Sequence, residues 1–173
     1  MMSFWRVFVI FFVSYSTILF LFIKIEVDGI SMLPTIQDKS FVFAKKNYPF
    51  LSKVNRGDII SFSVKEDETD YIKRVIGIPG DTVQLQNGQL IINNETIPKV
   101  RASEMNEFTE TLNNGQSYNV LDTEDSDEYD NTKKYLVPAK HYFVLGDNRD
   151  ISRDSRSLGF VHQKDIQEKI IDK

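Results

Sequence analysis

The sequence predicts a mainly β, antiparallel domain that follows one N-terminal transmembrane helix. Three observations support this prediction: an uncharged apolar stretch near the start, short alternating runs separated by turn residues after it, and enough apolar residues for a core. The 173 residues are 41% hydrophobic and include 13 Phe. This composition suits one folded domain with an anchor and excludes a chain that is disordered throughout.

The apolar stretch runs from Val7 to Ile23 without a charged side chain. As a helix it would be roughly 25 Å long, and residues 4–6 extend it to the thickness of a hydrocarbon core. A cleaved secretory signal is the alternative, because Ser14-Tyr15-Ser16 resembles a small-x-small cleavage site. The chain stays apolar from Ile18 to Ile23 directly after that site, which favours a retained anchor over residues 1–24. The charges on its two sides are too balanced to set its orientation.

Beyond the anchor, short runs rich in β-branched and aromatic residues alternate in polarity, which is typical of strands. The predicted strands are Phe41 to Lys45, Ile59 to Val64, Tyr71 to Ile76, Thr82 to Gln86, Gln89 to Ile92, Tyr135 to Pro138 and His141 to Leu145. Asn87-Gly88 predicts a type I′ hairpin, because both central residues of that turn need a positive φ. The last stretch, His162 to Ile171, is predicted to be helical.

Residues 83–137 are predicted to form an inserted β-rich subdomain, and residues 25–82 and 138–173 the domain around it. The insertion contains a polar stretch, Ala102 to Lys134, with an acidic run from Asp122 to Asp130. We interpret this run as a solvated loop. A calcium loop is disfavoured, because no glycine occupies the tight-turn position and no glutamate closes a twelve-residue loop.

Net charge and the lack of cysteine limit the partners, nucleophiles and metal sites that the protein can have. The net charge of −4 gives no general basic field, so a nucleic-acid partner is not expected. The absence of cysteine excludes disulfides, a cysteine nucleophile and thiolate zinc sites. No metal or cofactor is implied, and the remaining candidate nucleophiles are hydroxyls, carboxylates and amines. The sequence does not predict an oligomeric state.

Two residues suggest acyl-transfer chemistry. Ser31 lies in Gly29-Ile30-Ser31-Met32-Leu33-Pro34-Thr35, just beyond the anchor, and Lys73 lies in the predicted strand Tyr71 to Ile76. A serine hydroxyl needs a neighbouring base, and a lysine serves near neutral pH only if its pKa falls by roughly 2 to 3 units from about 10.4. Burial beside Ile72 and Val75 would lower it. Taken singly, the two residues would be read as a turn serine and a solvated lysine.

A third element, Gly146 to Arg156, completes a resemblance to type I signal peptidases. The motifs of that family are Ser-Met-x-Pro-Thr, an Arg-Gly-Asp strand, Lys-Arg-Val-x-Gly-x-Pro-Gly-Asp and Gly-Asp-Asn-Arg-x-x-Ser-x-Asp-Ser-Arg. They correspond here to Ser31 to Thr35, Arg56 to Asp58, Lys73 to Asp81 and Gly146 to Arg156. The resemblance implies a single-pass serine endopeptidase of the bacterial cytoplasmic membrane, with an antiparallel β catalytic domain on the outer face. It would cleave signal peptides from exported preproteins after small residues at −1 and −3, through an acyl-enzyme and without a cofactor.

The resemblance also implies roles for single residues. Ser31 would be the nucleophile and its backbone N–H the oxyanion donor, Lys73 the general base, and Ser152 the residue that holds the lysine amine. Two ion pairs would brace the site, Asp154 with Arg156 and Asp147 with Arg74. The shallow substrate pocket would be lined by Val27, Met32, Ile36, Tyr71 and Ile72.

Gly29 departs from the family pattern. Some members carry a serine there, two residues before the nucleophile, whose hydroxyl adds a second oxyanion donor. The Gly29 region therefore lacks that donor in its side chain, and Gly29→Ser is predicted to raise kcat modestly. A positive φ at this glycine would instead make serine strained.

Other functions remain as alternatives. A self-cleaving repressor-type Ser-Lys protease would be expected to carry a DNA-binding module and no anchor. An inactive membrane-anchored binding domain would fail to react with a covalent label directed at Ser31. The Ser-x-x-Lys motif of β-lactamases is absent, and His141 and His162 are interpreted as structural residues, so a Ser-His-Asp triad is not expected.

Overall fold

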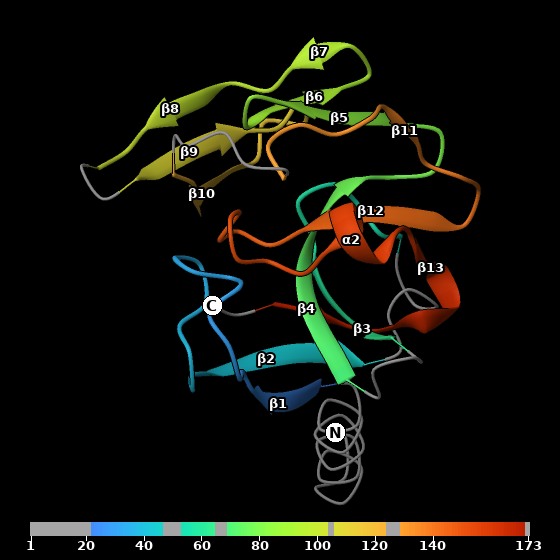
Figure 1. The fold of residues 1–173 in the computed structure, drawn as a ribbon. Coiled ribbons are helices and arrows are strands. Elements are labelled where there is room, and N and C mark those ends of the chain that lie inside the picture. Colours follow the sequence, from blue (N-terminus) through green and yellow to red (C-terminus); the bar gives the residue numbers. More distant parts are fainter. Residues whose placement is uncertain (1–21, 47–52, 65–68, 104–105, 124–128, 172–173) are drawn as a thin grey trace, which may run out of the picture.

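A computed structural model describes residues 22–46, 53–64, 69–103, 106–123 and 129–171, which form three sheets (Figure 1). All but the last three residues of the predicted anchor lie outside the described ranges. Those three belong to the first strand, β1 (Phe22–Glu26), so the prediction of a helix is wrong for Phe22 and Ile23. Within the described ranges, none of the helices has the length and apolar character needed to cross a bilayer.

The largest sheet has seven strands in the order β1-β2-β14-β3-β4-β12-β13, and neighbouring strands are antiparallel. After β1 its strands are β2 (Phe41–Lys46), β3 (Ile59–Val64), β4 (Thr69–Gly77), β12 (His141–Leu145), β13 (Val161–His162) and β14 (Ile166–Ile170). The Arg-Gly-Asp segment expected to be a strand is instead the turn before β3, where Gly57 has φ 89°.

The C-terminal segment corrects the sequence analysis. The predicted helix from His162 to Ile171 is only a 3-10 turn, η1 (Gln163–Asp165), followed by strand β14. Ile166 and Ile170 are both buried, and a separation of four residues places two side chains on one face of a helix. In the structure a register shift between Ile166 and Glu168 interrupts the alternation of β14, and the two isoleucines belong to different hydrophobic clusters. The segment is a strand because β14 forms backbone hydrogen bonds with both β2 and β3.

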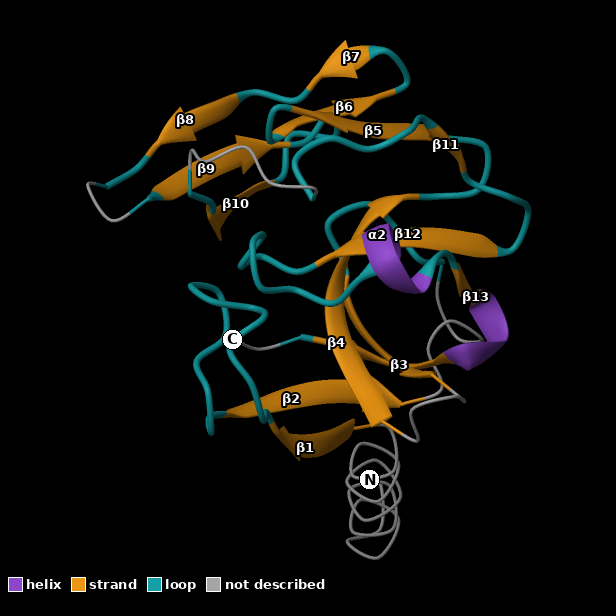
Figure 2. Cartoon of the chain, viewed as in Figure 1, coloured by secondary structure: helices purple, strands orange, loops and turns teal. Residues whose placement is uncertain are grey.

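The insertion forms two smaller antiparallel sheets above the large one (Figure 2). The four-stranded sheet has the order β11-β5-β6-β7, with β5 (Thr82–Gln86), β6 (Gln89–Ile92), β7 (Glu95–Thr96) and β11 (Tyr135–Leu136). The predicted type I′ hairpin between β5 and β6 is confirmed, since Asn87 has φ 49° and Gly88 φ 69°.

The three-stranded sheet has the order β10-β9-β8, with β8 (Lys99–Arg101), β9 (Glu107–Thr111) and β10 (Ser117–Leu121). Sequence analysis missed β9 and β10, which lie within the stretch read as polar. The inward positions of β9 are Phe108 and Glu110, and a charged residue at an inward position hides the apolar alternation.

The acidic run is also corrected. Asp122 and Asp130 are buried, with 2% and 5% of their surface exposed. Asp122 is ion-paired with Lys99 of β8. The interpretation as a solvated loop is therefore wrong for these two residues, and residues 124–128 lie outside the described ranges.

Strand β4 connects the large sheet with the insertion. Ile76 near its end shares one hydrophobic cluster with Phe143 and Leu145 of β12 and with the apolar residues of β5 and β6. The boundaries drawn at residues 83 and 137 stay a prediction, because this cluster contains residues from both sides of them.

Residues 146–156, here called the 146–156 loop, lead from β12 into the short helix α2 (Ser155–Leu158). The Asp154 side chain caps α2 by accepting from the Arg156 N–H. The Ser155 hydroxyl accepts a 2.9 Å hydrogen bond from the Val144 N–H of β12, so the helix lies against that strand (Figure 2). The loop is thus fixed at both ends.

Candidate active site

Ser31 and Lys73 lie together at the edge of a groove. The Lys73 Nζ is 2.8 Å from the Ser31 Oγ and 2.9 Å from the Ile72 carbonyl oxygen. Ser31 comes from the turn between β1 and β2, and Lys73 from β4, where it pairs in register with Ile60. A central strand therefore presents the amine to a serine 42 positions earlier in the chain.

Burial suits the Lys73 amine to the role of a base. Only 3% of its surface is exposed, and burial lowers the pKa of its amine to about 8. The carboxylates of Asp154 and Asp147 act in the opposite direction but do not offset the desolvation. A substantial fraction of the amine is therefore neutral at mildly alkaline pH and able to take the serine proton.

This pKa predicts how the rate of any reaction that uses Lys73 as base depends on pH. Because only the neutral amine accepts a proton, kcat/KM should rise with pH and level off above an apparent pKa of about 8. Below that pKa the rate should fall about tenfold per pH unit. A pH profile of the initial rate checks this, and a profile that is flat from about pH 6 to 9 would exclude Lys73 as the base.

Both predicted ion pairs are present and buried. Arg74 donates to Asp147 through Nε (2.8 Å) and Nη2 (2.6 Å), and Arg156 donates to Asp154 through Nε (2.9 Å) and Nη2 (2.8 Å). Each of the four side chains is at most 2% exposed. Bidentate pairs of this kind fix orientation as well as charge.

The expected contact between Ser152 and Lys73 is not formed. Ser152 is 3% exposed, and its Oγ has no hydrogen-bond partner among the described residues. The Oγ lies instead against Gly146, where any side chain would overlap it. The motif placed Ser152 beside the site correctly but did not give the direction of its hydroxyl.

Sequence analysis missed the residue that holds the segment carrying the nucleophile. Asn148 donates its backbone N–H to the Ser31 carbonyl oxygen (3.0 Å) and its side-chain amide to the Ile30 carbonyl oxygen (3.2 Å). Its place in the Gly-Asp-Asn-Arg motif was the signal that could have found it. Among the described residues we find no acceptor for the Ser31 N–H, which leaves this group available to an oxyanion.

Gly29 is present for its backbone conformation. Its φ is 123°, and its N–H donates to the Asp38 Oδ1 at 2.7 Å. A Cβ at this position would meet no atom within 4 Å, so a side chain would be strained rather than crowded.

The expectation of a faster Gly29→Ser variant therefore changes. Both Gly29→Ser and Gly29→Ala should lose about 1 to 3 kcal/mol of stability, seen as a melting temperature lower by several degrees. Both variants carry the same backbone strain, so any contribution of the serine hydroxyl to oxyanion stabilisation is measured as the difference in kcat between them. An alanine variant as stable as the parent would mean that this φ is not maintained in solution.

The groove beside the two residues has a volume of about 570 Å³. Four of the five predicted pocket residues line it, namely Val27, Met32, Tyr71 and Ile72. Ile36 does not; it is 2% exposed and packs behind Val27 and Met32 in the core. The prediction is wrong for Ile36 because residues near one another in sequence need not share a surface.

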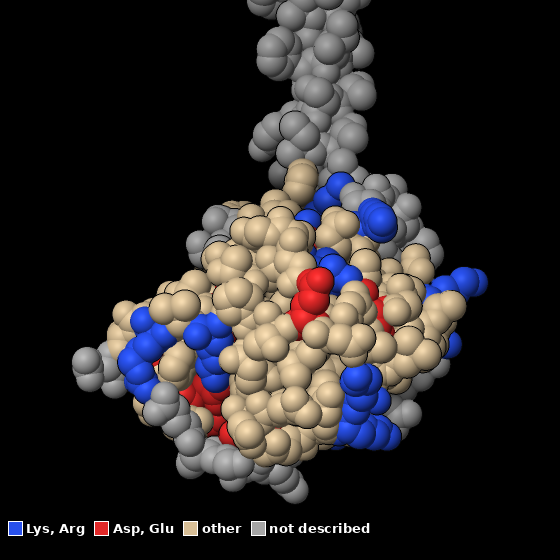
Figure 3. Space-filling view, turned by 90° about the horizontal axis from the view of Figure 1, so that it is seen from above, with Lys and Arg blue, Asp and Glu red and all other residues tan. Residues whose placement is uncertain are grey.

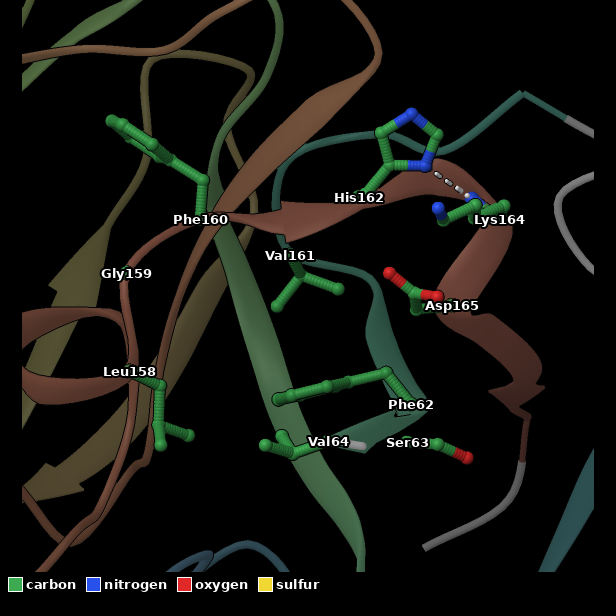
Figure 4. A pocket seen from close by; sticks show the side chains of 10 residues that line it. All are labelled: Phe62, Ser63, Val64, Leu158, Gly159, Phe160, Val161, His162, Lys164 and Asp165. Atoms are coloured by element: carbon green, nitrogen blue, oxygen red, sulfur yellow. Dashed lines mark hydrogen bonds between the residues drawn. The ribbon is translucent and has the colours of Figure 1, made fainter. Parts of the chain in front are cut away.

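A second cavity, of about 230 Å³, lies beside β3 and β13 (Figure 4). Its lining residues include His162, whose Nδ1 accepts a 3.0 Å hydrogen bond from the Lys164 N–H. His141 contacts the His162 ring, with centroids 4.8 Å apart, and its Nδ1 lies 2.9 Å from the Ala139 carbonyl oxygen. Both histidines thus make local contacts away from Ser31, as expected of structural residues.

Acidic residues gather at one further place. Asp122, Asp130 and Asp150 each bring a carboxylate oxygen within 4.8 Å of the others. The Lys99 ammonium is paired with Asp122, so the cluster contains its own cation, and we assign no metal ion to it. On the face shown in Figure 3, basic side chains lie in separate groups between acidic and uncharged ones. That nucleic acid is no partner stays a prediction.

Comparisons with known proteins agree on one family. Residues 1–171 match the family model described as "Signal peptidase, peptidase S26". The chain is 38% identical over 149 residues to signal peptidase I P of Bacillus subtilis subsp. natto, covering 86% of this chain and 74% of that protein. It is 42% identical over 137 residues to signal peptidase I of Rickettsia bellii (strain OSU 85-389), covering 70% of this chain and 47% of that protein. A crystal structure of a signal peptidase I from Enterococcus faecalis V583 is similar with 31% identity and a TM-score of 0.46, covering 69% of this chain and 97% of that one.

Proposed function

Because the chain belongs to the signal peptidase family, peptidase S26, and is thus a serine protease, we propose that it cleaves signal peptides from exported preproteins with Ser31 and Lys73 as its catalytic dyad. The observation that carries this proposal is the 2.8 Å separation between the Ser31 Oγ and a buried Lys73 amine. A nucleophile within hydrogen-bond reach of a base whose pKa is near the working pH is what covalent hydrolysis requires.

The reaction follows from this geometry. The Ser31 Oγ attacks the scissile carbonyl carbon while its proton passes to the Lys73 Nζ. The carbonyl oxygen becomes an oxyanion that the Ser31 backbone N–H can stabilise. The Lys73 ammonium then protonates the leaving amine as the peptide bond breaks, which leaves an acyl-enzyme. Water, deprotonated by the now neutral lysine, releases the signal peptide as a free acid and regenerates the serine.

The groove supports a preference for small residues at −1 and −3. Met32, Tyr71 and Ile72 border it next to the dyad and give this part of the groove an apolar lining. A large side chain at −1 would have to displace buried residues such as Met32, which is 1% exposed. Overpacking of this kind is costly.

We further propose that residues 1–21, which precede β1, anchor the enzyme in the bacterial cytoplasmic membrane, with the catalytic domain on the outer face. The uncharged sequence from Val7 to Leu21 supports the anchor, and the family relationship supports its side. The signal peptide's own apolar segment would enter the same bilayer. Sharing one membrane raises the effective concentration of substrate at the enzyme.

One experiment tests the proposed function. The full chain in lipid vesicles is incubated with a purified preprotein, and the new N-terminus of the product is sequenced. Cleavage after the expected small residue, lost when a bulky residue such as tryptophan replaces it at −1, is the expected result. An intact preprotein, with no covalent labelling of Ser31, would favour the inactive binding domain.

A further inference from the structure

A buried ion pair joins the inserted sheet to the 146–156 loop. Arg149 donates to Glu110 of β9 through Nη1 (2.7 Å to Oε1) and Nη2 (2.6 Å to Oε2). The two side chains are 2% and 0% exposed. The Tyr118 hydroxyl of β10 donates to the same carboxylate at 2.7 Å, so Glu110 is held from its own sheet as well.

Arg149 in turn organises the loop. Its Nε donates to the Gly146 carbonyl oxygen at 3.1 Å, and its backbone N–H donates to the Leu121 carbonyl oxygen at 2.8 Å. Its own carbonyl oxygen accepts from the Arg156 guanidinium, which is also paired with Asp154. One arginine thus connects the first part of the loop, the insertion and the Asp154–Arg156 pair.

The same loop touches the nucleophile on its backbone side. Asn148, next to Arg149, donates its N–H to the Ser31 carbonyl oxygen at 3.0 Å. Gly146 lies so close to the Ser31 carbonyl oxygen and the Ser152 hydroxyl that a Cβ there would overlap both. A displacement of the loop would therefore move Ser31 and the N–H that faces the oxyanion.

We propose that Glu110 is a positioning residue for the cleavage reaction: through Arg149 it holds the 146–156 loop against Ser31. This inference rests on the proposed function and adds to it a role for the inserted sheet. A buried ion pair often adds little net stability over an apolar pair of similar shape, whereas its two parallel hydrogen bonds fix direction. Position, rather than stability, is what this pair supplies to the site.

The first test replaces Glu110 with glutamine in the full chain, in vesicles, with a preprotein substrate. The amide keeps the size of the carboxylate but turns one acceptor into a donor that faces the guanidinium. We expect kcat to fall about 10- to 100-fold, because a displacement near 1 Å at a reacting centre has that effect. KM should change less than about threefold, since the groove residues are untouched. Glu107→Gln is the matched control on the same strand and should keep the parental kcat.

Glu110→Gln leaves the Arg149 charge buried without a carboxylate, and this could lower the rate by destabilising the fold. A double variant without either charge separates that effect from the loss of loop positioning, and it also serves if Glu110→Gln folds poorly. Glu110→Leu with Arg149→Met removes both charges and replaces the buried ion pair with two apolar side chains. We expect its melting temperature to approach that of the parent while kcat stays at least tenfold lower. Rates are expressed per folded molecule, with the folded fraction taken from the thermal transition.

The outcomes separate this inference from the proposed function. A parental kcat in Glu110→Gln, or in the double variant, would overturn the positioning role while leaving the peptidase intact. A rise in KM with unchanged kcat would also overturn it, because that pattern reports substrate binding. If the parental chain itself fails to cleave any preprotein, the proposed function fails first.

Discussion

Ser31→Ala is expected to lower the cleavage rate by about 10⁴-fold or more while the protein stays folded. The residual rate in hydrolases that lose the nucleophile comes only from binding and oxyanion stabilisation, because no acyl-enzyme can form. Ser31 is partly exposed at the groove, so removing one oxygen leaves no cavity in the core. Single-turnover cleavage of a preprotein measures the rate, and the melting temperature should stay within a few degrees of the parent.

The matched control is Ser117→Ala, which removes the same atom from an exposed strand position in the insertion. Its rate should equal that of the parent. Retention of more than a few per cent of activity by Ser31→Ala would mean that another group attacks the carbonyl, and the dyad would have to be abandoned.

The dyad and its two ion pairs were predictable because each lies in a motif with fixed spacing. The strands were predictable for a different reason, since half-buried strands alternate in polarity and their turns need special residues such as Asn87 and Gly88. Both signals are local in sequence. They required no knowledge of the partner strand.

Errors arose where a distant partner decides the structure. Glu110 makes its stretch of sequence look polar until Arg149 is seen beside it, and so β9 and β10 were missed. The spacing of Ile166 and Ile170 suits a helix until β2 and β3 are found on either side.

Roles carried over from a family have the same limit. Ser152 and Ile36 occupy the expected positions in sequence, yet the Ser152 hydroxyl makes no contact with Lys73, and Ile36 lies behind the groove. A motif fixes the residue type and its approximate place. The direction of a side chain depends on what packs against it.

Lys73→Met should abolish turnover to about the same extent as the loss of Ser31, because nucleophile and base act as one unit and their contributions are not additive. Methionine matches the lysine stem in size but cannot accept a proton. Lys73→Arg is the companion variant. It keeps a positive charge that is never lost at working pH, so it should be equally inactive.

Lys73→Met should also stabilise the folded protein. At pH 7 the parent keeps a buried ammonium whose pKa has fallen from 10.5 to about 8, a penalty of about 3 kcal/mol. Because the folded pKa lies below the unfolded one, this penalty is complete below pH 8 and declines as the pH rises toward 10.5. Lys73→Met should thus melt several degrees above the parent at pH 7, with a smaller difference near pH 10. An inactive methionine variant that is less stable than the parent at pH 7 would show that the fold stabilises the Lys73 ammonium, so that the pKa of the amine is not lowered, which is incompatible with its role as the base.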